Sequence, residues 1–436
     1  MTALSRAAGD GRPAAPVALV HLGLGNFFRA HQAWYTEQAP DAAEWGIAAF
    51  AGRGAKLAEA MSPQDGLYTL ITRAADGDRF EVIGSVARAH AADDHRAWLD
   101  CFASAGVRAV SITVTEAGYL RGADGGLNRD DPTVRADIET LRRDPTGLVR
   151  SAPGRLVAGL GARRRADAGP FTLLPCDNLP GNGEVVARVV GDLAEAVDPG
   201  LAAWIGSTVS TVTTTVDRIT PRTTPADGDA VREATGRTDR APVATEPFSE
   251  WVLSGTFAGG RPQWEEAGAV FTDDITPFEH RKLWLLNGGH SLLAYAGSAR
   301  GHRTVADAVA DGTCRSWLEQ WWAEASPYVD LPEGDLAAYR AALLERFANP
   351  RIEHQLEQIA ADGSQKLPVR ILPTVARERA AGRMPAGAVR VLAGWICTLR
   401  GQGAPVNDAH ADEVVPLADG PLPDATRKVL GVLDPV

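Results

Sequence analysis

The side chains best suited to chemistry lie in one short segment, FEHRKLWLLNGGH, which runs from Phe278 to His290. On an α-helix, at about 100° per residue, Lys282, Asn287 and His290 share one broad face. Lys282 lies about 12 Å along the axis from His290, and its long side chain spans much of that distance toward a shared substrate. Glu279, one turn before the lysine, is placed to relay a proton. This pattern predicts a proton-transfer site.

The ordinary alternative for such a helix is a solvated Glu279–Lys282 pair and a core histidine. Two features favour chemistry. Gly288 and Gly289 interrupt an otherwise apolar helix, and each costs roughly 1 kcal/mol relative to alanine, so we expect them to allow close approach of a ligand or of backbone. The turn PCDNLPGNG, Pro175 to Gly183, follows an apolar strand, at the edge where α/β sheets bind ligands.

A second chemical feature is the glycine turn after the first predicted strand. Gly23-Leu24-Gly25 begins a dinucleotide-binding fingerprint, in which glycines allow a sharp turn and let backbone N–H groups reach a pyrophosphate. Phe28 stands where the third glycine is usual, so the motif by itself is weak and also fits a plain strand-to-helix turn. The predicted cofactor is NAD, and its predicted binding residues are Gly23, Gly25, Asn26 and Phe27.

The end of the second predicted strand bears on the choice between NAD and NADP. Sheets that bind NAD usually place an acidic residue there for the ribose 2′-hydroxyl. Here the sequence FAGRGAK, Phe50 to Lys56, carries no acid, and Arg53 offers a cation for a 2′-phosphate. A lone arginine after a glycine is as often a solvated loop residue. NADP is therefore not excluded.

These side chains depend on the elements that position them. Runs of β-type residues alternate with helical segments over residues 1–272, which predicts a Rossmann-like, doubly wound α/β domain. Its expected strands are 16–25, 45–52, 107–115, 171–178 and 207–219, with an inserted hairpin, YTLITRA and RFEVIGSVARA, and a long surface excursion at 221–247. Helical periodicity dominates residues 273–436, so a mostly α-helical domain is expected there.

Composition narrows the class of partner. A net charge of −11 and a pI near 5.4 disfavour nucleic acid and anionic membranes, and the chain lacks the run of about 18 apolar residues that predicts a transmembrane helix. The four cysteines form no CxxC or Cys/His cluster, so neither disulfides nor zinc are indicated. Residues 1–16 lack the apolar core of a signal peptide and are expected to form a loose extension. We expect a cytoplasmic protein with a small-molecule substrate.

Seven motifs along the chain resemble those of the polyol-specific long-chain dehydrogenases, the family of mannitol 2-dehydrogenases and fructuronate reductases. They are HLGLGNFFRAHQAWYTE, QDGLYTL, TEAGY, CDNLPGNG, VDRITP, the K-x4-N-x2-H set and DGSQKLP, and they span nearly the whole sequence in order. What the resemblance implies is an oxidoreductase that interconverts a secondary alcohol and a ketone on a polyol or sugar acid, without a metal.

In that family the lysine matching Lys282 is the general base for alcohol oxidation and the general acid for ketone reduction. Such a lysine must be desolvated or lie near other cations, a role open to Arg281, because a free lysine is protonated at neutral pH. The resemblance assigns further roles by position. Amide groups of Asn178 and Asn287 would hold the oxygen that gains negative charge. His290 would orient a hydroxyl, Glu279 would assist proton passage, and Asp217 and Lys366 would contact substrate.

One departure from the family leaves the substrate open. Mannitol dehydrogenases place a sugar-contacting arginine four residues before the Asp-Gly of the DGS motif, and the matching position here is Gln358. Arg370 or Arg351 would supply a cation for a carboxylate-bearing substrate, although arginines in such helices more often lie at the surface. Fructuronate reductase and mannitol 2-dehydrogenase activities both stay open.

Two alternatives belong to other functional classes. A non-catalytic protein that senses nicotinamide nucleotides would use the same fold, but the intact set of lysine, asparagines and histidine argues against it. The tryptophans between Trp317 and Trp322 raise the idea of a helical module that recruits partners, although aromatic residues at that spacing are more often core. No pattern signals an oligomer, and we expect a monomer.

Overall fold

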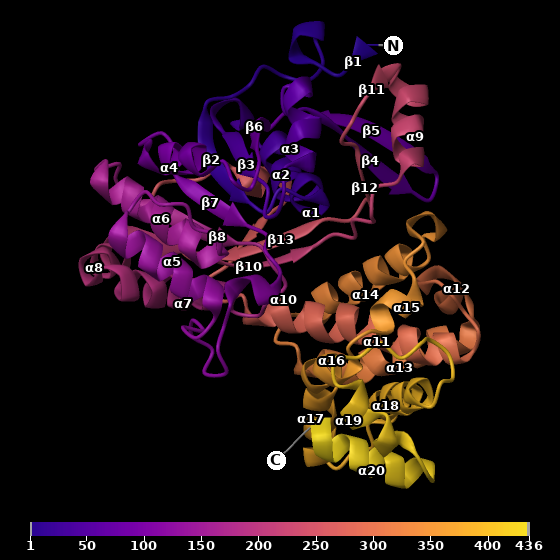
Figure 1. Ribbon diagram of the computed structural model, residues 1–436. Helices are drawn as coiled ribbons and strands as arrows, with labels where there is room; N and C mark the ends of the chain where they lie inside the picture. Colours follow the sequence, from indigo (N-terminus) through magenta and orange to yellow (C-terminus); the bar gives the residue numbers. More distant parts are fainter. Residues whose placement is uncertain (1, 434–436) are drawn as a thin grey trace. The chain divides into compact units, whose positions relative to one another are not determined.

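The computed structural model describes residues 2–433 and divides the chain into two compact units, Met1–Ile275 and Thr276–Val436 (Figure 1). All β-strands of the described residues lie in the first unit, and the second is helical. The helices of the first unit are α1 (Asn26–Ala30), α2 (Gln32–Gln38), α3 (Lys56–Met61), α4 (His95–Ala103), α5 (Pro132–Arg143), α6 (Ala152–Arg165), α7 (Asn182–Val197), α8 (Pro199–Thr208) and α9 (Pro225–Thr235).

The first unit is built on a six-stranded parallel sheet. From edge to edge its strands are β6 (Val86–His90), β3 (Gly46–Phe50), β2 (Val17–Leu22), β7 (Ala109–Ile112), β8 (Phe171–Pro175) and β9 (Val209–Thr211). The chain starts at the centre, builds outward to β6, and then returns to add β7 beside β2. This is the doubly wound order of a Rossmann fold, as predicted, and its topological switch point lies between β2 and β7.

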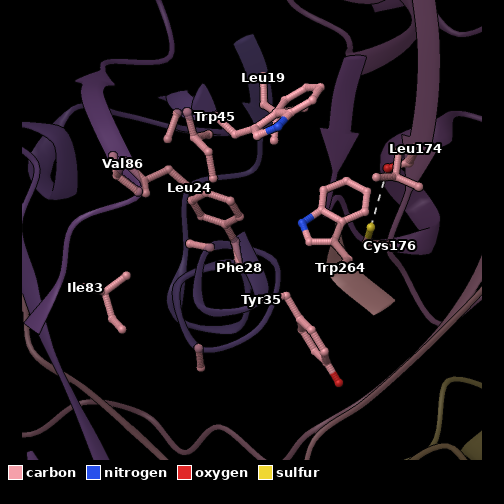
Figure 2. Packing of buried hydrophobic residues seen from close by; sticks show 14 of the residues in the cluster. Leu19, Leu24, Phe28, Tyr35, Trp45, Ile83, Val86, Leu174, Cys176 and Trp264 are labelled. Atoms are coloured by element: carbon pink, nitrogen blue, oxygen red, sulfur yellow. Dashed lines mark hydrogen bonds between the residues drawn. The ribbon is translucent and has the colours of Figure 1, made fainter. Parts of the chain in front are cut away.

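Side-chain alternation along the strands gives the sheet two separate cores. Along β2, Leu19 faces one core, whereas Val20 and Leu22 face the other. The second core is closed by α4, α5, α6 and α7, which gather on one side of the sheet (Figure 1). Figure 2 shows the first core, in which Phe28 of α1 and Trp264 pack among residues of β2 and β8. Burial on both faces leaves the strand ends as the accessible edge.

Two smaller sheets correct the expected strand pattern. RFEVIGSVARA is two strands, because only β5 (Gly77–Ile83) pairs with β4 (Tyr68–Ala74), and the remainder is β6 of the main sheet. The expected strand 207–219 also divides. Its first half is β9, and its second half, β10 (Thr213–Asp217), pairs antiparallel with β13 (Glu250–Ser254), which β14 (Val270–Phe271) joins. Both segments have β-type composition throughout, so the sequence did not show at which residue the chain passes from one sheet to another.

Two segments expected to be loose are instead docked. The expected excursion at 221–247 contains α9, the short β11 (Arg237–Thr238) and the buried β12 (Val243–Thr245), which extends the β4–β5 sheet. The N-terminal extension begins with β1 (Thr2–Ala3) on β11, and Leu4 is buried. Arg6 donates to the carbonyls of Gly84 and Val86. The backbone groups of these segments pair with parts of the chain that are distant in sequence. A polar local sequence gives no sign of such partners.

The second unit consists of helices, as predicted. They are α10 (Thr276–His280), α11 (Gly288–Leu292), α12 (Val305–Ala310), α13 (Gly312–Ala325), α14 (Glu333–Phe347), α15 (Leu356–Ala360), α16 (Gly363–Arg370), α17 (Leu372–Ala380), α18 (Ala386–Leu399), α19 (Ala411–Val414) and α20 (Leu422–Leu433). The π-helical segment Arg281–Asn287 joins α10 to α11, and a second π-helical segment, Leu293–Gly297, continues the same helix after α11. Trp321 and Trp322 of α13 are buried, so the tryptophan-rich stretch contributes to the core. Within residues 2–433, no helix has the length and apolarity needed to cross a bilayer.

Candidate active site

The predicted dinucleotide turn lies at the switch point of the sheet. Gly23 has φ +116°, and the backbone N–H groups of Gly23 and Leu24 both donate to the carbonyl of Phe50 at 2.9 Å. A Cβ on Gly23 would lie 2.4 Å from the carbonyl oxygen of Thr113, so any larger residue would push β2 and β7 apart. The first glycine of the motif is therefore required by the fold as well as suited to a ligand.

The residues after this turn leave the start of α1 open to an anion. Gly25 is the N-cap, with extended backbone, and no side chain among residues 2–433 caps the helix there. Asn26 is held by other contacts, since its Nδ2 donates to Thr223 Oγ1 at 3.0 Å and its Oδ1 accepts from Arg29 at 2.7 Å. Glycine at the cap and unblocked backbone N–H groups fit a dinucleotide phosphate. Arg53, beyond β3, is exposed.

A cavity of about 470 Å³ opens at the carboxyl ends of β7 and β8. Phe27, predicted to bind cofactor, and Asn178, predicted to be catalytic, both line it, although they lie far apart in sequence. Phe27 stacks on the ring of His31 at 5.0 Å. The other lining residues are Thr113, Val114, Thr115, Glu116, Ala117, Cys176, Asp177 and Val216. A cavity at this edge of an open α/β sheet is where such folds bind their ligands.

Buried polar contacts fix the loop that carries Asn178. The side chain of Asn182 is fully buried, donates to the carbonyl of Thr214 at 3.0 Å and accepts from its N–H at 2.9 Å. Asp177 accepts from the hydroxyl of Tyr119 and from the N–H of Leu179. Burial raises the pKa of the Asp177 carboxyl and that of the Tyr119 phenol. The sequence did not single out Tyr119 and Asp177 as a pair, because only the fold brings them together.

His21, which the sequence did not single out, lies on β2 just before the glycine turn. Its Nδ1 is hydrogen-bonded to the hydroxyl of Ser111 at 2.8 Å, and its Nε2 to that of Thr113 at 3.0 Å. The ring stacks on Phe28 at 3.5 Å. Burial lowers its pKa to about 3. A neutral imidazole therefore ties β2 to β7 beneath the turn.

Asp217, a predicted substrate contact, also belongs to the first unit. It is the last residue of β10, is 6% exposed and lies opposite Glu250 of β13. Its neighbour Val216 lines the cavity described above. The structure thus places Asp217 beside the same strand edge as Asn178.

In the second unit, the predicted catalytic segment is not a regular α-helix. Lys282 and Asn287 both lie in the π-helical stretch, where hydrogen bonds run from residue i to i+5. Residues five apart therefore lie on the same side, whereas α-helical geometry would have separated them by about 140°. Both side chains are half-buried. In this π-helical stretch the side chains of Lys282 and Asn287 therefore point in more similar directions than the predicted α-helix would allow.

The glycines that follow serve packing, which corrects the expectation of ligand approach. A Cβ on Gly288 would meet the ring of Trp321 at 2.8 Å, and one on Gly289 would meet Leu318 at 2.9 Å. The indole nitrogens of Trp321 and Trp322 donate to the backbone carbonyls of Trp284 and Leu285, each at 2.9 Å. These carbonyls lie in the π-helical stretch, so the tryptophans support its irregular backbone.

His290 is a buried histidine with a polar atom left over. It is 6% exposed, and its ring packs on Phe347 at 4.6 Å and edge-on to His354 at 5.1 Å. Its Nε2 is buried and has no hydrogen-bond partner among the described residues. Burial lowers the pKa of His290 well below its usual range, and the positive charges of His354, Arg346 and Arg370 lower it further. The ring is therefore neutral, with one nitrogen available to a substrate hydroxyl.

Arg370 reaches the same helix from α16. Its Nη1 donates to Ser291 Oγ at 3.2 Å and to the carbonyl of Asn287 at 3.4 Å. The position that carries an arginine in the mannitol branch, Gln358, is exposed on α15, and Arg351 is exposed as well. Arg370, one of the two cations considered from the sequence, therefore contacts the helix that carries Lys282 and Asn287.

Lys366 and Glu279 are half-buried residues of the second unit. The ammonium of Lys366 donates to the carbonyls of Ile359, at 3.3 Å, and Ala361, at the end of α15. Glu279 is in α10, directly before the π-helical stretch. Arg281 is buried, with its guanidinium 4.2 Å from the ring centre of Tyr339. The roles assigned to these residues stay predictions.

Two family models divide the chain much as its fold does. The mannitol dehydrogenase Rossmann domain matches residues 17–266, and the mannitol dehydrogenase C-terminal domain matches residues 274–419. The chain belongs to the mannitol dehydrogenase family. Its predicted fold class and family are thereby confirmed, and so is its class as an oxidoreductase acting on CH–OH groups.

Relatives within the family have different substrates in their names. The chain is 40% identical over 367 residues to D-mannonate oxidoreductase of Escherichia coli K12, covering 82% of this chain and 74% of the relative. It is 35% identical over 392 residues to mannitol 2-dehydrogenase of Cereibacter sphaeroides, covering 88% and 81%. These named enzymes give no support to a non-catalytic sensor.

Solved structures of the family share the fold. A substrate-free D-sorbitol dehydrogenase has a TM-score of 0.87 at 31% identity, over 96% of this chain and 92% of that one. The mannitol 2-dehydrogenase of Pseudomonas fluorescens, solved as a ternary complex with NAD and D-mannitol, has a TM-score of 0.81 at 32% identity, over 97% and 91%.

Proposed function

We propose that this oxidoreductase interconverts a ketouronate and the corresponding aldonate, rather than fructose and mannitol. The observation that carries the proposal is the contact of Arg370 with Ser291 and with the carbonyl of Asn287, beside His290. Guanidinium groups recognise carboxylates through paired hydrogen bonds, and such pairs are stronger than neutral ones. Buried Arg346 adds positive charge near His290. A substrate that carries a carboxylate fits this charged surrounding better than a neutral polyol.

The cofactor of this reaction is NAD, as the Rossmann domain and the NAD-bound relative indicate. Bound NAD would supply the hydride acceptor for oxidation of the carbinol carbon, and NADH the hydride donor for reduction of the ketone. The glycine turn and the backbone N–H groups after Gly25 would hold the pyrophosphate, and Phe27 would border the cavity. Arg53 is exposed at the position where NAD enzymes usually have an acidic residue, so NADP should be tested as a cofactor as well.

We propose that Lys282 is the proton-transfer residue. Its amine would take the hydroxyl proton as the alcohol is oxidised and return it as the ketone is reduced, with no metal in the step. The amide groups of Asn287 and Asn178 would donate to the oxygen on which negative charge develops. The neutral ring of His290 would orient a hydroxyl through Nε2. Asp217, Lys366 and Glu279 are assigned to substrate contact and proton passage.

The assay that tests the substrate follows cofactor oxidation by purified protein, with NADH and NADPH, against D-fructuronate, D-tagaturonate, D-fructose and D-xylulose. We expect turnover with a ketouronate and kcat/KM at least tenfold lower for the ketoses. Equal or better turnover with fructose or xylulose would contradict the proposal and make Gln358 a tolerated substitution in a polyol dehydrogenase.

We infer that the protein works as a monomer in the cytoplasm. Its four cysteines are free thiols, which suits a reducing compartment. Sedimentation of the purified chain tests the oligomeric state directly.

A further inference from the structure

Three side chains that the sequence does not mark as a group meet at the start of α13. They are His302, in the loop after the catalytic helix, Asp311, the N-cap of α13, and Cys314, in its first turn. A ring nitrogen, a carboxylate oxygen and a thiol sulfur, one from each, all lie within 4.8 Å of one another. We propose that His302, Asp311 and Cys314 bind a divalent cation of the zinc class, at a site separate from the proposed catalytic residues.

Local structure holds each of these groups in place. One oxygen of Asp311 accepts from the N–H of Thr313 at 2.8 Å, which leaves the other, Oδ2, directed to His302 Nε2 at 2.9 Å. The backbone N–H of His302 donates to Gly297 at 3.1 Å, which anchors the loop. Cys314 is fully buried. The fold therefore holds the three side chains close together, and their proximity does not depend on freely rotating surface side chains.

The donor set selects the class of ion. Sulfur, imidazole nitrogen and a carboxylate oxygen are zinc ligands, whereas Mg²⁺ and Ca²⁺ prefer oxygen alone. Zinc bonds are about 2.0–2.3 Å long, which places two ligands of a tetrahedral ion roughly 3.3–3.6 Å apart. The three donors lie within 4.8 Å of one another, with His302 Nε2 and Asp311 Oδ2 at 2.9 Å, so shifts of about 1 Å bring them to that arrangement. The side chains of His302 and Asp311 are 24% and 15% exposed, which leaves access for water as a fourth ligand. Charge balances, because the thiol proton goes to solvent and a carboxylate and a thiolate face a 2+ ion.

Arg300 is the competitor for this site. Its Nε and Nη2 both lie 2.8 Å from Asp311 Oδ2, the oxygen that the ion would need. Its side chain is 41% exposed, so it can turn to solvent when an ion binds. If the cluster were only an ion-pair network, neither the wild-type protein nor a variant that lacks Arg300 would bind a metal ion.

Cobalt chloride added to the reduced full-length protein tests the site, because a thiolate bound to Co²⁺ gives an intense ligand-to-metal absorption in the near-ultraviolet. We expect this band in the wild-type protein and its loss in Cys314→Ser. Cys101→Ser and Cys397→Ser remove half-buried thiols elsewhere and serve as matched controls that keep the band. A wild-type protein without the band, or Cys314→Ser with it, overturns the proposal.

Arg300→Gln gives the sharper result. Removing the competing cation is expected to tighten Co²⁺ and Zn²⁺ binding roughly tenfold. Asp311→Asn, which can still cap the helix, is expected to weaken binding by at least as much. Unchanged or weaker binding in Arg300→Gln would overturn the assignment. Both variants are judged by metal titration and by the rise in melting temperature with Zn²⁺, independently of turnover.

Discussion

Arg370 donates from Nη1 to the hydroxyl of Ser291 at 3.2 Å, one residue after His290. The two side chains come from helices some 80 residues apart, and this bond places a guanidinium against the helix that carries Lys282 and Asn287. Gln358, at the position where the mannitol branch has an arginine, is exposed, so under our proposal the cation for the substrate comes from Arg370. We therefore propose that this contact sets the preference of the protein for charged over neutral substrates.

Arg370→Gln is expected to raise KM for the ketouronate and lower its kcat/KM roughly ten- to a hundredfold, the value of a charge-assisted hydrogen bond. Turnover of a neutral ketose should fall much less. Steady-state kinetics on both substrates measure the difference. Arg351→Gln, at an exposed position, is the matched control. Equal losses on both substrates would assign Arg370 to the fold instead of to the carboxylate.

Lys282→Ala should lower kcat by roughly a hundredfold or more, because the proton loses its acceptor in the transition state. Cofactor affinity, measured by quenching of protein fluorescence with NADH, should be unchanged. Lys428→Ala, on the exposed face of α20, removes an amine with no assigned role. Normal turnover in Lys282→Ala would exclude this lysine as the proton-transfer group.

Gly288→Ala separates packing from ligand approach at the glycine pair. The added methyl would meet the Trp321 ring at 2.8 Å, and such overpacking destabilises a folded protein by about 1–3 kcal/mol. The higher helix propensity of alanine offsets only roughly 1 kcal/mol of this loss. We expect a lower free energy of unfolding in urea titrations. Gly334→Ala, in α14 with open space around its Cβ, should cause no loss. A stable Gly288→Ala with a raised KM would restore the ligand explanation.

Stability should depend on pH through His21. Burial lowers its pKa from 6.5 to about 3, so below pH 6.5 the unfolded chain binds a proton that the folded protein excludes. The free energy of unfolding contributed by this group is complete above pH 6.5 and is lost as pH falls toward 3, by up to about 1.4 kcal/mol per pH unit. Urea unfolding at pH 7 and pH 5 measures the slope. His21→Gln should flatten it, and an unchanged slope would show that other groups dominate.

Treatment with EDTA is expected to leave turnover unchanged, because the proposed step moves a proton through Lys282 and needs no metal. The expectation holds even with an ion at the His302 cluster, which contributes none of the assigned catalytic residues. Reversible loss of activity that Zn²⁺ restores would contradict the metal-free mechanism.

Local sequence determined much of this protein. Alternating apolar runs and helical periodicity predicted a Rossmann sheet followed by helices, because burial on sheet faces and helix stripes imposes those periods directly. The glycine turn at Gly23 was visible because only glycine tolerates its φ and its approach to Thr113. The motifs containing Lys282, Asn178 and His290 indicated the family.

Tertiary structure alone decided the rest. The π-helical stretch that brings Lys282 and Asn287 to one side depends on tryptophan indoles from α13, and no period in the local sequence encodes that contact. The same holds for Arg370, because its own helix does not show that its guanidinium contacts Ser291, and that contact is the basis for its proposed role. Groups distant in sequence acquire a shared chemistry when packing fixes their separation, and packing is a property of the whole fold.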